Sequence, residues 1–125
     1  MADTVRELLK GKILSLHDDG IEDASGEDDV FTIPALGGSF AAVIHVTSVH
    51  GTAAHLSAHI VNVDPVTHLE DSILIFTRNT AVGSEWKYDL ESGKAFANQI
   101  KLKWALDGSA VPKIGFAVVL HLKPT

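Results

Sequence analysis

Cysteine is absent from the 125-residue chain, and long apolar runs are absent as well. The lack of cysteine excludes disulfide bonds, thiolate metal sites and cysteine nucleophiles, but it assigns no compartment. The longest apolar stretches, such as Phe116–Leu120, are about a quarter of the ~20 residues that a membrane-spanning helix needs. Residues 1–10, MADTVRELLK, show no apolar core followed by a small-residue cleavage site. We therefore expect neither export nor a membrane partner.

Basic residues are too few to dominate the charge of the chain. Ten lysines and arginines stand against sixteen acids, which gives a formal net charge of −6 with neutral histidines. A global basic field that would hold a nucleic-acid backbone is missing, so we expect no direct nucleic-acid partner. The chain does have the length of one ordinary domain, and a domain of this size buries enough surface to fold without a disulfide or metal staple.

The negative charge is concentrated in one segment, DDGIEDASGEDD, over residues 18–29. It holds seven acids in twelve residues, whereas the rest of the chain has nine acids and ten bases. Like-charge crowding and small turn residues predict a solvated loop. A partner-facing acidic patch and a cation site are the alternatives, although the spacing lacks the alternating register of a helix–loop–helix calcium loop.

Alternating apolar residues predict most of the secondary structure. Residues 40–47 have a period of two, with one face formed by Phe40, Ala42, Ile44 and Val46. A short turn over residues 50–54 precedes a second strand, whose inward residues are Leu56, Ala58 and Ile60. Two such strands joined by a short connector that contains glycine predict a β-hairpin.

Further strands are predicted over residues 12–16, 30–33, 72–77, 85–90, 98–106 and 114–122. About seven or eight short strands with frequent turn signals and no long helix predict an all-β fold. The expected architecture is a single antiparallel β-sandwich, either jelly-roll or immunoglobulin-like. We expect the sandwich domain to cover residues 30–125, after an N-terminal arm and acidic loop over residues 1–29.

Two segments carry a resemblance to a known family: VIHVTSVHGTAAHL over residues 43–56 and IKLKWALDGSAVPKIGFAV over residues 100–118. In the first, a Val-Thr-x-Val step is followed by a Gly-Thr turn and a strand that opens with leucine. In the second, a tryptophan-containing strand leads through a Gly-x-x-x-Pro turn into a strand with an aromatic residue. In this order the chain resembles small β-sandwich structural proteins of tailed bacteriophage virions. The matching residues are Val46, Thr47, Val49, Gly51, Thr52, Leu56, Trp104, Gly108, Pro112 and Phe116.

The resemblance implies a non-enzymatic role as a capsid decoration (cement) protein. Such a protein binds the outer surface of the major capsid shell and stabilises it, on the virion, after synthesis in the host cytoplasm. The major capsid protein is then the partner, and a homotrimer is favoured because linked contacts reinforce one another. The alternatives are a head–tail joining or tail structural protein, and a carbohydrate-binding module in which Trp86 stacks on sugars.

Catalytic constellations are not recognisable in the sequence. His55 and His59 would lie about 13 Å apart in a strand, too far to share an ion. No serine has the glycine-flanked elbow of a nucleophile. We therefore expect no catalytic residue, no metal and no cofactor. Alternation with lysines favours inward packing of Trp86, Tyr88 and Trp104, and Trp86 is the best candidate for an exposed aromatic. The candidate partner-binding residues are Arg6, Leu8, Leu9, Asp18, Asp19, Glu22, Asp23 and Trp86.

Overall fold

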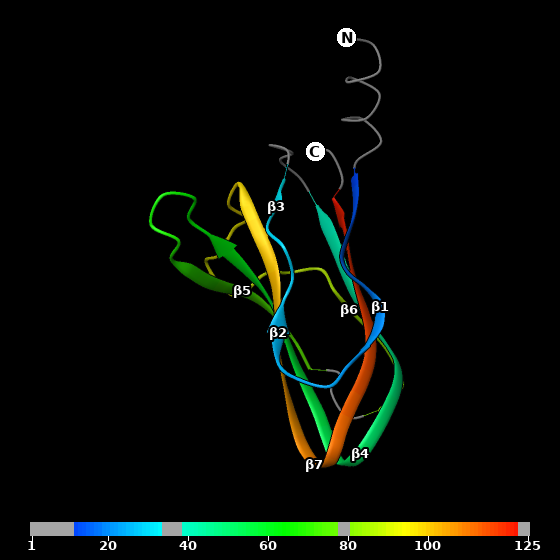
Figure 1. The fold of residues 1–125 in the computed structure, drawn as a ribbon. Helices are drawn as coiled ribbons and strands as arrows, with labels where there is room; N and C mark the ends of the chain where they lie inside the picture. Colours follow the sequence, from blue (N-terminus) through cyan, green and yellow to red (C-terminus); the bar gives the residue numbers. More distant parts are fainter. Residues whose placement is uncertain (1–11, 34–38, 78–80, 123–125) are drawn as a thin grey trace.

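The computed structural model describes residues 12–33, 39–77 and 81–122. Within these ranges the chain is all-β, as predicted, and its strands form one seven-stranded antiparallel sheet (Figure 1). The strands are β1 (Lys12–Glu22), β2 (Gly26–Glu27), β3 (Phe31–Thr32), β4 (Phe40–Val63), β5 (Glu70–Phe76), β6 (Gly83–Lys87) and β7 (Gln99–Leu122). The described ranges contain no helix that is long and apolar enough to cross a membrane.

The sheet is organised around its two longest strands, β4 and β7, which have 24 residues each. The strand order is β1-β7-β4-β5, with β2 and β3 also on β7 and β6 also on β4. Residues 40–50 of β4 pair with residues 113–122 of β7, and residues 55–62 pair with residues 100–107. Each long strand therefore contributes one half to each of two strand groups.

Both long strands bend in the middle, at the same end of the molecule (Figure 1). The bends contain residues with positive φ, namely Gly51 and Ala53 in β4 and Gly108, Ala110 and Val111 in β7. The hairpin predicted around residues 50–54 is therefore wrong. Its two strands are halves of β4 that pair with β7 rather than with each other. Because β7 bends opposite β4, the two strands stay paired on both sides of the bend. The glycine-containing segments that predicted turns therefore end neither strand.

Close backbone contacts lock the two bends together. A β-carbon built on Gly51 would lie 2.9 Å from Cα of Pro112, and one built on Gly108 would lie 2.8 Å from Cα of Ala54. Both glycines also have positive φ, which side-chain-bearing residues rarely adopt. Each bend therefore requires glycine for its own conformation and for the approach of the other strand.

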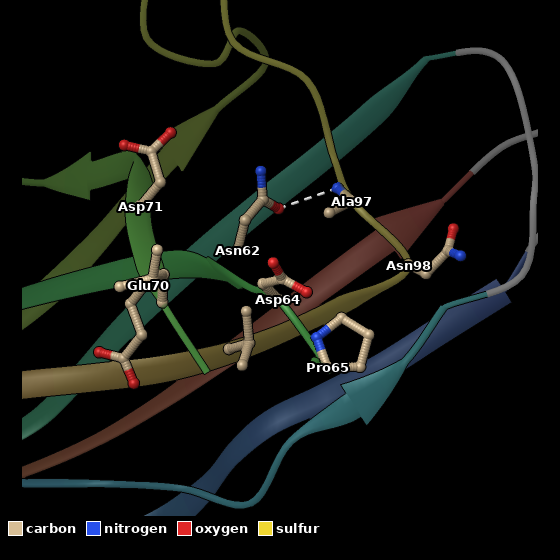
Figure 2. A pocket seen from close by; sticks show the side chains of 9 residues that line it. Asn62, Asp64, Pro65, Glu70, Asp71, Ala97 and Asn98 are labelled. Carbon is tan, nitrogen blue, oxygen red and sulfur yellow. Dashed lines mark hydrogen bonds between the residues drawn. The ribbon is translucent and has the colours of Figure 1, made fainter. Parts of the chain in front are cut away.

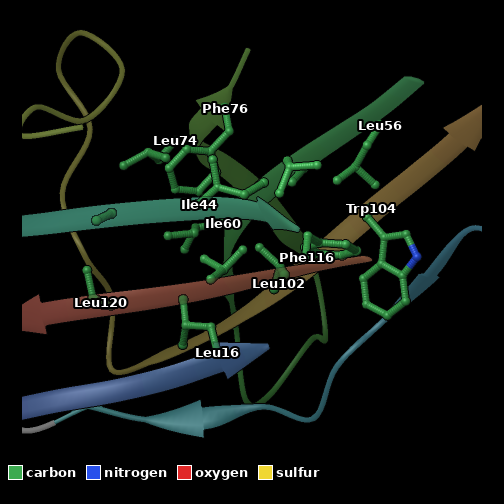
Figure 3. Close-up of a cluster of buried hydrophobic side chains, with 14 of the residues drawn as sticks. Leu16, Ile44, Leu56, Ile60, Leu74, Phe76, Leu102, Trp104, Phe116 and Leu120 are labelled. Atoms are coloured by element: carbon green, nitrogen blue, oxygen red, sulfur yellow. The ribbon is translucent and has the colours of Figure 1, made fainter. Parts of the chain in front are cut away.

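The bend brings the inward faces of both strand groups onto one hydrophobic core (Figure 3). Ile44 and Leu56 come from the two halves of β4, and Leu102 and Phe116 come from the two halves of β7. All four side chains are fully buried. The predicted alternation of residues 40–47, 56–60, 98–106 and 114–122 is confirmed, since their expected inward residues are buried or half-buried. β5 adds Phe76 and β1 adds Leu16.

The acidic segment is partly built into the sheet, although most of its acidic side chains are exposed. Residues 18–22 continue β1 along β7, and Gly26 and Glu27 form β2 on the same strand. Trp104 explains this order, because its indole Nε1–H donates to the carbonyl of Ala24 at 2.9 Å and its ring lies directly against Gly26. The backbone N–H of Leu106 also donates to Oγ of Ser25 at 2.9 Å. The loop prediction is therefore wrong for residues 18–22 and 26–27, because charge density does not reveal these backbone and small-residue contacts.

Substituting alanine for glycine at the bend provides a test of this locking. We expect Gly108→Ala to lower the free energy of unfolding by roughly 2–5 kcal/mol, because backbone strain adds to a clash with Ala54. Gly93→Ala is the matched control, since Gly93 also has positive φ but a β-carbon there meets nothing within 4 Å. It is expected to cost about 1–2 kcal/mol. Urea unfolding measures both, and equal losses would contradict the proposed locking.

Candidate partner-binding face

The predicted site residues fall into three groups. Arg6, Leu8 and Leu9 lie outside the described residues. Trp86 is exposed on β6, as expected for the best exposed aromatic, whereas Trp104 is buried and Tyr88 is exposed. The prediction that all three aromatic side chains pack inward therefore holds for Trp104 alone. The four predicted acids lie in or directly after β1. Asp18, Asp19 and Asp23 are exposed, whereas Glu22 is half-buried.

Trp86 belongs to an outward-facing surface that four strands share. In one row Trp86 of β6 pairs with Val43 of β4, which pairs with Val119 of β7, which pairs with Ser15 of β1. In the neighbouring row His121 of β7 pairs with Ala41 of β4 and with Ile13 of β1. We call this surface the aromatic face and define it by Ile13, Ser15, Ala41, Val43, Trp86, Tyr88, Val119 and His121. None of these eight residues is lysine, arginine, aspartate or glutamate.

Large apolar side chains of the aromatic face are open to solvent. Relative exposure is 49% for Trp86, 63% for Tyr88 and 69% for Ile13. The Trp86 and Tyr88 rings are nearly parallel, at 8°, with centroids 6.4 Å apart, and the His121 ring lies 5.8 Å from that of Trp86. Contiguous apolar surface of this kind typically marks an interaction site. Tyr88, Ile13 and His121 were not predicted as site residues. The signal that could have revealed them is the apolar character of both faces of residues 40–44 and 116–120.

Two of the predicted acids lie beside this face. The Ser15 hydroxyl donates to Asp18 at 2.6 Å, and the Thr47 hydroxyl donates to Asp19 at 3.0 Å. Ser15 belongs to the aromatic face, and Thr47 continues the outward alternation of β4. Asp18 and Asp19 therefore form an exposed acidic margin next to an uncharged centre. The structure thus brings Asp18, Asp19 and Trp86 to one side of the sheet.

Glu22 turns inward instead, toward a buried histidine. His17 is 5% exposed and stacks on Phe116, with ring centroids 4.1 Å apart. Its Nδ1 lies 2.6 Å from Oδ2 of Asp28, and its Nε2 lies 3.4 Å from Oε1 of Glu22. Glu22 and Asp28 therefore serve the packing of β1 against β7. Asp23 is exposed in the bend that follows β1 and lies in neither arrangement.

The outer side of the other strand group is charged. Lys101 and Lys103 of β7 both contact Glu70 of β5, with Nζ–O distances of 2.5 and 2.7 Å, and both contact Glu27 of β2. Hydrogen bonds from Lys101 and Lys103 lower the pKa of Glu70, and the bond to Glu70 raises the pKa of Lys101. These ion pairs tie β2 to its neighbour β7 and join β7 to β5 across the intervening strand β4.

Two other places on the sheet bring serine and histidine side chains together. Ser57 Oγ lies 2.8 Å from Nε2 of His59, whose Nδ1 lies 3.2 Å from Oγ of Ser72. These side chains form a hydrogen-bonded row on an open sheet surface. His45 of β4 lies beside β6, with its Nδ1 2.6 Å from Oγ of Ser84. Among the described residues, no group of three or more histidines and acids could hold a metal ion.

An open groove of about 670 Å³ lies where β4 ends and β5 begins (Figure 2). The Asn62 amide bridges to the facing loop, donating to the carbonyl of Ala95 at 2.8 Å and accepting from the N–H of Ala97 at 2.9 Å. Asp64 accepts hydrogen bonds from the Val66 N–H and the Thr67 hydroxyl, which lower its pKa. The polar groups named here are thus engaged in shaping the loops around the groove.

The chain matches no protein-family model, no curated protein and no solved structure. We therefore base the functional proposal on the contacts and charges of the aromatic face.

The lysine–glutamate pairs make the stability of the fold depend on pH in the acid range. Because the pKa of folded Glu70 is lowered from 4.5, Glu70 stabilises the fold above that pH, and this stabilisation is lost as the pH falls through the folded value. We expect Glu70→Gln to be less stable than the parent at neutral pH and to lose less stability on acidification. Thermal unfolding between about pH 7 and pH 3 measures this difference. Parallel curves for parent and variant would contradict it.

Proposed function

We propose that this chain is a structural binding protein of a tailed-bacteriophage virion, of the capsid decoration type. In this proposal it binds the outer surface of the major capsid shell and strengthens the joints between shell subunits. The observation that carries the proposal is the aromatic face, a surface without lysine, arginine, aspartate or glutamate and with exposed Trp86, Tyr88 and Ile13. The virion context of the proposal comes from the motif resemblance. The two glycines of those motifs, Gly51 and Gly108, have positive φ and lie at the two bends.

Docking through the aromatic face agrees with what protein interfaces require. The centre of an interface is depleted in charge and enriched in aromatic residues, and its rim is polar. Trp86 and Tyr88 supply aromatic surface, while Asp18 and Asp19 supply a charged margin. Large exposed aromatics of this kind are the side chains that most often dominate binding free energy. This role requires a rigid surface and no chemistry, so we assign no catalytic residue or cofactor.

The proposal extends to architecture and assembly. We propose that the bent sheet is a β-sandwich, because residues from both halves of β4 and β7 bury one core between two strand groups. We propose a homotrimer, because three linked copies would turn modest contacts with the shell into durable attachment. A head–tail joining or tail protein would instead assemble into hexameric or dodecameric rings. Analytical ultracentrifugation distinguishes a trimer from such rings.

One observation favours a second candidate, a carbohydrate-binding module. The Trp86 and Tyr88 rings are exposed and nearly parallel, and aromatic faces of this kind can stack on sugar rings. Glycan-array binding that is lost in Trp86→Ala would support this candidate. It would count against capsid decoration if the same protein did not bind shells.

Co-sedimentation with mature capsid shells that lack the protein tests the main proposal. We expect saturable binding at a fixed ratio to the major capsid protein, and at least tenfold weaker binding for Trp86→Ala, the order expected for a central interface aromatic. Ile75→Ala is the matched control, because Ile75 is also exposed but lies on β5, outside the aromatic face. Absence of binding, or equal weakening by both substitutions, would contradict the proposal.

The segment before β1 is the second proposed contact with the shell. Arg6, Leu8 and Leu9 precede Lys12, where β1 begins beside the aromatic face. Deleting residues 1–11 removes these side chains and leaves every described strand intact. We expect the deletion to weaken co-sedimentation severalfold while the thermal unfolding midpoint stays unchanged. Unchanged binding would exclude this segment as an anchoring arm.

A further inference from the structure

The Trp86–Tyr88 ring pair has the chemistry to bind a positively charged planar group. We propose that it binds the guanidinium group of an arginine side chain on the protein that the aromatic face contacts. This inference rests on the proposed function, because it names the chemical group by which a protein partner would engage that face. It adds a ligand class that the fold and the motif resemblance do not specify.

Geometry supports a stacked cation at this position. The two rings are nearly parallel, and the His121 ring also lies near Trp86, with centroids 5.8 Å apart and an interplanar angle of 29°. Both Trp86 and Tyr88 are about half exposed or more, so part of each ring is in contact with solvent. A guanidinium stacks on an aromatic face within about 6 Å of the ring centroid, and tryptophan is the most favourable ring for this contact.

Charge complementarity supports the same ligand. The chain has a formal net charge of −6, and the aromatic face contains no lysine or arginine to repel a cation. The carboxylates of Asp18 and Asp19 lie on the same side of the sheet.

The apolar surroundings of the ring pair favour arginine over lysine. Trp86 lies beside Val43, and the next residues along the two rows are Ala41 and Val119. These apolar side chains offer a cation no hydrogen bonds to replace those of the water it loses. A lysine ammonium is compact and strongly hydrated, so it leaves water less readily than the flat, weakly hydrated guanidinium does. The ring pair therefore discriminates by stacking as well as by charge.

Titration with tetra-arginine and tetra-lysine peptides, both acetylated and amidated, tests this inference. The tryptophan indole N–H signals are followed by NMR at low ionic strength and about pH 8, where imidazole side chains in water are neutral. We expect tetra-arginine to shift the Trp86 signal and to bind roughly two- to fivefold more tightly than tetra-lysine. The Trp104 signal is an internal reference, since its N–H is held by Ala24.

Variants assign the preference to the rings. In a Trp86→Ala/Tyr88→Ala double variant, we expect the two peptides to bind equally, whereas Ile75→Ala should keep the parent preference. An unmoved Trp86 signal, or an arginine preference that persists in the double variant, would overturn the inference. Shell binding without an arginine preference would refute only this inference. An arginine preference without shell binding would refute only the proposed function.

Discussion

The close approach of two bent strands is the constraint on which the rest of the structure depends. Gly51 of β4 lies against Pro112 of β7, and Gly108 of β7 lies against Ala54 of β4. Because neither glycine can carry a β-carbon without meeting backbone, each bend fixes the position of the other. A single antiparallel ladder can then change direction without ending. The two strand groups close on one core, and no additional strand is needed to join them.

This closure leaves two outer surfaces with different chemistry. On one, lysines of β7 bind Glu27 and Glu70 and hold the edge strands β2 and β5. On the other, outward positions are valine, alanine, histidine and aromatic residues, with Trp86 and Tyr88 exposed. An antiparallel sheet can keep one face in water when that face is polar, as the first surface is. The aromatic face departs from this rule, and a binding role gives a physical reason for the departure.

The core could be predicted from sequence because burial on one face imposes a period of two. Ile44, Leu102 and Phe116 were all placed inward by this pattern alone. The bends in β4 and β7 could not be predicted as bends. A glycine-containing turn has the same sequence pattern whether the chain reverses into a hairpin or only bends within one strand. What decides is the pairing with a second strand that bends opposite, and this contact is about sixty residues away in sequence for Gly51 and Pro112.

The candidate site was predictable only in part. Trp86 was identifiable because the strand predicted around it is short, and short strands are typical of sheet edges. The charge density of residues 18–29 predicts one loop. It does not reveal that the Trp104 indole donates a hydrogen bond to the carbonyl of Ala24 and so orders the segment. As a result Asp18 and Asp19 stay on the outer surface, while Glu22 and Asp28 turn toward His17. Separating these roles required the three-dimensional register of β1 on β7.

Hydroxyl-radical footprinting of the protein, free and bound to capsid shells, tests the central claim that the aromatic face is the docking surface. The account predicts that oxidation of Trp86, Tyr88 and Ile13 falls on binding, while oxidation of Leu69 and Ile75, which are exposed outside the aromatic face, stays unchanged. Undiminished oxidation of Trp86 and Tyr88 in the bound protein would contradict it.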